Sequence, residues 1–187
     1  MMLSEKLYPQ RVFYYFEQIA AIPHGSRNTK AISDFLVNFA KEHNLVWYQD
    51  ENNNVVIVKE ASAGYEAAEP IIIQGHMDMV CEKEKGVDID FEKDGLKLYI
   101  DGDFLKAEGT TLGGDDGIAV AYALALLDSQ EIAHPKLEVV ITVDEEIGML
   151  GADAIDLSML TGHTMLNIDS DVEGSFLTGC AGGMAVN

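Results

Sequence analysis

Basic residues, cysteine and long apolar runs are all scarce in this sequence of 187 residues. Twelve Lys and Arg stand against 32 Asp and Glu, which gives a formal charge of −20 at pH 7. A field this negative repels nucleic-acid phosphates and anionic lipid, so it excludes roles on nucleic acid or at a membrane surface. The longest apolar stretch, residues 117–127, falls well short of the roughly 20 residues that span a bilayer. The negative field attracts cations, although the simplest interpretation of most of the acids is solubility.

The two cysteines, Cys81 and Cys180, stand far apart and form no Cys-x-x-Cys pair. The N-terminal stretch MMLSEKLYPQ has neither a basic start nor an apolar run, so it does not resemble a signal peptide. Both cysteines are therefore expected to be reduced core thiols. These features predict a cytoplasmic protein.

The apolar pattern predicts an α/β fold in which a mostly parallel sheet is flanked by helices. Apolar residues recur at helical spacing from residue 9 to residue 20 and again over residues 29–43. Continuous apolar runs at residues 71–73, 137–143 and 165–168 are typical of parallel strands covered on both faces, and residues 117–127 predict a crossover helix. Two antiparallel hairpins are expected at residues 45–59 and 96–107.

Metal-competent side chains follow all three apolar runs and also precede the crossover helix. They are His76 and Asp78, Glu145 and Glu146, Asp169, and the pair Asp115 and Asp116. Ligands of open α/β sheets bind beyond the carboxyl ends of the strands. We therefore expect these four segments to meet at one edge of the sheet.

His76 and Asp78 stand two positions apart at a strand end, where they share a side. His76 is suited to bind a metal through one ring nitrogen, while Asp78 orients the ring. The alternative is a satisfied core histidine beside an aspartate in a turn. The residues themselves leave both interpretations open.

The acidic pairs carry similar alternatives. Adjacent residues of an extended backbone point opposite ways, so one of Glu145 and Glu146 can ligate a metal while the other takes a proton from water. A solvated acidic loop is the plainer interpretation. Asp115 either caps the following helix or, among its neighbouring glycines, bridges two cations. Asp169 is preferred to Asp171 because it is closer to the strand end.

Five motifs in this order resemble the co-catalytic zinc peptidase family, which includes peptidase T-type tripeptidases, carboxypeptidase G and Xaa-His dipeptidases. The motifs are GHMDMV, TLGGDDGIAVA, TVDEEIGMLGA, LNIDSDVEG and TGCAGG. The last motif and residues 110–119 look most like the aminoacyl-histidine dipeptidase, or carnosinase-like, branch. The resemblance extends from Pro9 to Gly183.

The resemblance implies a site for two Zn²⁺ ions, with Co²⁺ or Mn²⁺ as possible substitutes. His76 and Asp169 would bind the first zinc, and Asp115 would bridge both ions. Glu146 would bind the second zinc together with a histidine from much later in the family's chains. No segment of this sequence corresponds to that histidine.

The resemblance also implies the catalytic roles. Glu145 would be the general base that activates water between the zincs, and Asp78 would tune the site from behind the ligands. The peptide bond between Asp115 and Asp116 would be cis, although many relatives have Asn at the second position. The implied activity is hydrolysis of unblocked dipeptides, with the Xaa-His class favoured.

The family's lid domain, which binds the substrate's ends and mediates homodimers, has no counterpart here. Residues 1–187 are therefore expected to form the N-terminal portion of a metallopeptidase catalytic domain, and residues 180–187 to begin a further strand. Two rival functions remain: deacylation of N-acyl amino acids, and a non-catalytic peptide-binding relative. An unligated Glu145 argues against the second, because a binder has no use for a base there.

Overall fold

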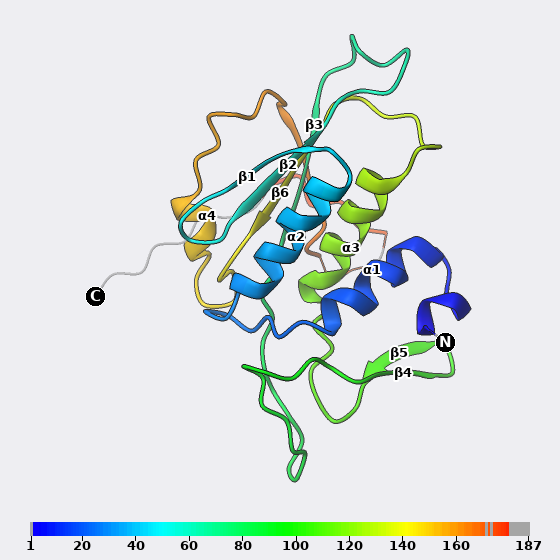
Figure 1. The fold of residues 1–187 in the computed structure, drawn as a ribbon, viewed down its shortest axis with the longest axis vertical. Coiled ribbons are helices and arrows are strands. Elements are labelled where there is room, and N and C mark those ends of the chain that lie inside the picture. Colours follow the sequence, from blue (N-terminus) through cyan, green and yellow to red (C-terminus); the bar gives the residue numbers. More distant parts are fainter. Residues whose placement is uncertain (1, 171, 173, 180–187) are drawn as a thin grey trace.

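The computed structural model describes residues 2–170, 172 and 174–179, so the expectations for Asp171, Cys180 and the tail lie outside the described residues. The elements follow one another in this order: η1 (Leu3–Lys6), α1 (Gln10–Ala20), α2 (Lys30–Glu42), β1 (Val46–Gln49), β2 (Val55–Lys59), β3 (Ile71–His76), β4 (Leu98–Asp101), β5 (Phe104–Ala107), α3 (Gly114–Asp128), β6 (Leu137–Thr142), α4 (Leu150–Ala154) and β7 (Thr164–Asn167) (Figure 1).

The main sheet has the strand order β1-β2-β6-β3-β7. β3 pairs with β6 and with β7 in parallel, and α3 lies between β3 and β6 in the chain as the predicted crossover helix. The hairpin of β1 and β2 joins this parallel part through an antiparallel pairing of β2 with β6. The α/β sheet with flanking helices is therefore confirmed, in a mixed form. The second predicted hairpin, β4 with β5, forms a separate small sheet.

Helices α1, α2 and α3 cover one face of the main sheet (Figure 1). Their buried residues form one core with alternate residues of the strands: Phe16, Ile19, Ile32, Leu36, Val120, Leu124, Val55, Ile57, Val139 and Ile141. Burial of each large apolar side chain contributes about 1.5–3 kcal/mol relative to exposure. This layer fixes α3 against β3 and so sets where the start of α3 lies.

The opposite face is covered more thinly within the described part of the chain. Val56, Val58 and Val140 pack there against Ile155, Met159 and Leu160, which follow α4. All four residues of β7 are exposed. The expectation of helices on both faces thus holds fully for one face, while a short helix and its following segment lie on the other. Among the described residues, no helix is long and apolar enough to cross a membrane.

Candidate metal centre

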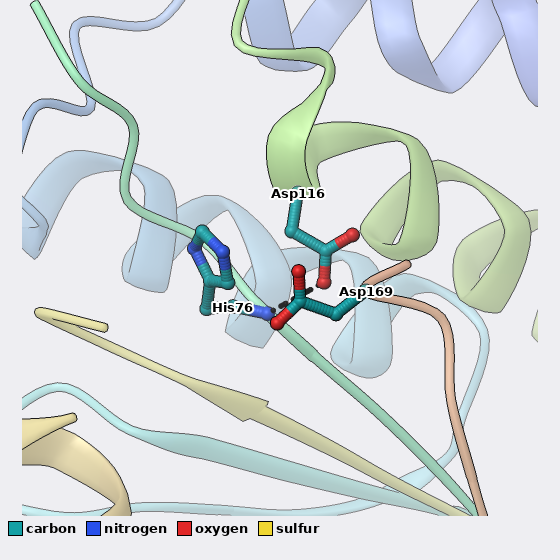
Figure 2. A group of neighbouring side chains, drawn as sticks. All are labelled: His76, Asp116 and Asp169. Atoms are coloured by element: carbon teal, nitrogen blue, oxygen red, sulfur yellow. Dashed lines mark hydrogen bonds between the residues drawn. The ribbon is translucent and has the colours of Figure 1, made fainter. Parts of the chain in front are cut away.

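The parallel strands bring His76 to the edge of the sheet where α3 begins. His76 is the last residue of β3 and its side chain is 1% exposed. Figure 2 shows its imidazole beside the carboxyl groups of Asp116, from the start of α3, and Asp169, which follows β7. Segments that are remote in the sequence therefore meet at one edge, as the strand ends predicted.

Two groups of donor atoms share His76. In one group the ligand atoms of His76, Asp115 and Glu146 all lie within 4.8 Å of one another, and in the other those of His76, Asp116 and Asp169 do. The Nε2 atom of His76 is 3.0 Å from Oδ1 of Asp115. The predicted ligands thus gather, but Asp115 and Asp169 belong to different groups. The ligand role of each residue stays a prediction.

Asp78 holds the imidazole from the opposite side. The Nδ1 atom of His76 lies 2.9 Å from the main-chain oxygen of Asp78 and 3.4 Å from its Oδ1. An Nδ1–H that donates to the main-chain oxygen leaves Nε2 free to face a metal. The Asp78 side chain is 0% exposed. Its carboxylate also accepts hydrogen bonds from the Ser26 hydroxyl at 2.7 Å and from the Glu145 N–H at 3.0 Å.

Asp116 was named as metal-competent with Asp115, but it was not among the residues assigned as metal ligands. Its buried carboxylate accepts the main-chain N–H of His76 at 3.1 Å, the bond that is dashed in Figure 2. A Cβ on Gly75 would lie 2.7 Å from Asp116 Oδ2, so the glycine leaves the space that this carboxylate fills. The glycine directly before His76 is therefore a feature of the sequence that could have indicated a side chain packed closely against this strand end. The peptide bond between Asp115 and Asp116 is cis, as the resemblance implied.

Glu145 and Glu146 lie in the turn that follows β6 rather than in extended backbone. Asp144 has a φ of 55°, so the chain bends sharply there. Oε2 of Glu145 is 3.8 Å from Nε2 of His76, while Glu146 belongs to the group with Asp115. Both carboxylates therefore approach the imidazole, and the opposite orientation expected of an extended pair does not apply.

The crowded carboxylates perturb one another's protonation. Burial by itself would lower the pKa of His76, but Asp78, Asp116 and Asp169 raise it to about 10. Burial, with the nearby Asp169 and Asp115, raises the pKa of Asp116 to about 8. Burial and neighbouring carboxylates also raise the pKa of Glu145, Glu146 and Asp169. Such a concentration of negative charge at one edge of the sheet favours a bound cation.

The donor set fits a divalent transition metal. An imidazole nitrogen that exchanges its proton for a cation, together with several carboxylate oxygens, is a ligand set that Zn²⁺ accepts, and Co²⁺ and Mn²⁺ bind similar sets. The other ring nitrogen of His76 already has a partner in the main-chain oxygen of Asp78, as is usual for metal-bound histidines. The residues present therefore fit the metal that the resemblance implied.

Residues 72–176 match the profile of peptidase family M20/M25/M40. The chain is 41% identical over 179 residues to the cytosol non-specific dipeptidase of Escherichia coli. The alignment covers 96% of this chain and 37% of that protein. The chain is 32% identical over 108 residues to peptidase T of Caldanaerobacter subterraneus, covering 54% of this chain and 26% of that one.

A crystal structure of aminoacylhistidine dipeptidase from Vibrio alginolyticus superposes with a TM-score of 0.88 at 40% identity, covering 91% of this chain and 35% of that one. A tripeptidase from Staphylococcus aureus shares the fold, with a TM-score of 0.72 at 24% identity, covering 87% of this chain and 44% of that one. The chain spans less than half the length of each of these relatives.

Proposed function

Because this chain belongs to peptidase family M20/M25/M40, we propose that the protein hydrolyses the peptide bond of unblocked dipeptides with the help of divalent metal ions. One observation carries the proposal. The buried imidazole of His76 lies between two groups of carboxylates at the carboxyl edge of the sheet. Residues 1–187 contribute these groups as the N-terminal portion of the catalytic domain.

We assign His76 and Asp169 to the first Zn²⁺, Asp115 to the position between two ions and Glu146 to the second. Asp116 lies close enough to His76 and Asp169 to contribute as well. Such ions, when bound, polarise the scissile carbonyl and lower the pKa of water to about 7. Co²⁺ and Mn²⁺ are alternative occupants of the same donor set.

Glu145 is the general base in this proposal. Its side chain is one-third exposed and its Oε2 is 3.8 Å from Nε2 of His76, so it can reach both the donor set and a substrate. It accepts a proton from the attacking water and returns that proton to the leaving amine. Burial raises its pKa above the usual value, which brings it nearer to the pH at which a base works best. Asp78 keeps the ring of His76 oriented.

The substrate class is narrower in our proposal than family membership requires. Similarity to the aminoacylhistidine dipeptidase of Vibrio alginolyticus supports the Xaa-His class, whereas the Escherichia coli relative is named a non-specific dipeptidase. The name of the Escherichia coli relative also supports a cytosolic location for this protein. A homodimer formed through a lid domain is a further proposal, which rests on the family resemblance alone.

The test compares wild-type protein with Glu145→Gln, using an Xaa-His dipeptide, a dipeptide without histidine and an N-acetyl amino acid. We expect Glu145→Gln to keep its bound metal, measured by elemental analysis, while turnover falls by at least about 100-fold, as for loss of a general base. The exposed Glu51 provides the control Glu51→Gln, which should leave turnover unchanged. Unaltered turnover in Glu145→Gln would remove this residue from the mechanism. Cleavage of the N-acetyl substrate alone would replace the dipeptidase proposal with a deacylase.

A further inference from the structure

We infer that Ser26 is a positioning residue for the metal centre and acts through the buried carboxylate of Asp78. The inference rests on the proposed function, because it concerns how firmly that centre holds its ion. Ser26 lies in the loop between α1 and α2, 52 positions before Asp78. Sequence spacing therefore gives no sign of the contact.

The two oxygens of Asp78 have different partners. Oδ2 accepts the hydrogen bond from Ser26 Oγ at 2.7 Å. Oδ1 accepts the main-chain N–H of Glu145 at 3.0 Å and lies 3.4 Å from Nδ1 of His76. One carboxylate thus links the loop after α1, the end of β3 and the turn after β6. It orients the imidazole and the main chain of the proposed base together.

Loss of the Ser26 hydroxyl would leave Oδ2 without this donor in a place that water does not reach freely. The Asp78 side chain is 0% exposed, and a buried acceptor that loses its partner is strongly destabilised. The carboxylate can recover a donor only by rotating. Rotation would also change its contacts with His76 and with the N–H of Glu145.

The surrounding loop holds Ser26 in place through further contacts. The N–H of Arg27 donates to Oδ1 of Asp144 at 2.6 Å, and both residues have left-handed backbone, with φ of 67° and 55°. The N–H of Met79 donates to the main-chain oxygen of His24 at 3.1 Å. The loop is thus bonded to two of the segments that supply the centre, those after β3 and β6, so the backbone around Ser26 directs its hydroxyl.

The experiment measures Co²⁺ affinity by competition with a chromophoric chelator, together with the visible absorption bands of bound Co²⁺, in the wild type and in Ser26→Ala. We expect about tenfold weaker binding in the variant, near the lower end for residues that support a metal ligand. The absorption bands should also change, because the imidazole is less well oriented. Ser26→Thr and Ser26→Val form a second pair that differs in the hydroxyl, and we expect Thr to restore the affinity and Val not to.

Ser33→Ala is the matched control for a purely structural effect. Ser33 is fully buried in α2 and donates to the main-chain oxygen of Asn53 at 2.7 Å, the same length as the bond from Ser26. Its loss should lower the thermal midpoint of unfolding and leave Co²⁺ affinity unchanged.

Three results would overturn the inference. Wild-type affinity in both Ser26→Ala and Ser26→Val would show that the hydroxyl does not position the centre. An equal loss of affinity in Ser33→Ala would show that general destabilisation explains the effect. A wild-type chain that binds no Co²⁺ would overturn the proposed function and this inference with it, whereas the first two results leave the proposed function standing.

Discussion

Replacing Glu138 with glutamine tests how much stability a buried carboxylate adds to this fold. Glu138 lies within β6 and is fully buried. Its oxygens accept hydrogen bonds from the Thr161 N–H and hydroxyl and from the Gly162 N–H at 2.7–3.0 Å. Lys136 forms an ion pair with it at 2.9 Å. These contacts fix the turn before β7, the strand that leads to Asp169.

The pKa of Glu138 sets the expected magnitude. Burial alone would raise it, but the hydrogen bonds from Thr161 and Gly162 and the Lys136 ammonium lower it from 4.5 to about 2. At about 1.4 kcal/mol per pH unit, the lowering from 4.5 to about 2 corresponds to at most about 3.5 kcal/mol, and solvent screening of the partly exposed Lys136 reduces it. Because the folded-state pKa is lowered, the stabilisation is complete above pH 4.5 and is lost as the pH falls toward 2.

Urea unfolding at pH 7 and at pH 3 measures this effect. We expect Glu138→Gln to lower the free energy of unfolding by about 2–3 kcal/mol at pH 7 and by about 1 kcal/mol at pH 3. The exposed control Glu51→Gln should change it by less than about 0.5 kcal/mol at either pH. An equal loss at both pH values would refute the assignment of the lowered pKa to Glu138.

Three further outcomes are expected. Zn²⁺ at about 100 times its Kd should stabilise the fold by about 2.7 kcal/mol, measured as a higher Tm with Zn²⁺ than with a chelator. The variant His76→Ala should show no such difference in Tm. If the difference persists in this variant, His76 is not a ligand. Gly75→Ala should lower the free energy of unfolding in urea by about 1–3 kcal/mol, because the new Cβ would lie 2.7 Å from Asp116 Oδ2. The control Gly114→Ala should lower it less, because the nearest atom to its new Cβ is 3.7 Å away. Equal losses in the two variants would contradict this explanation. Leu124→Ala should cost about 2–5 kcal/mol, since Leu124 is 1% exposed, and a loss below about 1 kcal/mol would show that its site collapses.

Local patterns in the sequence predict most elements of this fold, because helices and strands depend on the apolar spacing of nearby residues. The crossover helix, both hairpins and the parallel strands lie close to their predicted positions. The antiparallel attachment of β2 to β6 was not predicted, because a hairpin's own residues do not specify the neighbour of its second strand. Glu138 interrupts the apolar run that predicts the strand over residues 137–143. Its partners, Thr161 and Gly162, come only from the tertiary fold.

The same distinction applies at the metal centre. Strand ends predicted that His76 would meet the acidic segments, since parallel strands deliver their carboxyl ends to one edge. Whether Asp115 or Asp116 faces Asp169 depends on the backbone at the start of α3, where both residues depart from helical dihedrals. The contact of Ser26 with Asp78 depends on a loop from another layer. Neither arrangement follows from spacing along the chain.

The shared imidazole has a consequence for stoichiometry. With Nδ1 directed at Asp78, His76 offers the single lone pair of Nε2 to two sets of carboxylates. One ion at a time can occupy that lone pair, so a second ion in the described part of the chain would be held by oxygen alone. Filling of the two positions should therefore be unequal, and a zinc titration of the chain should be biphasic.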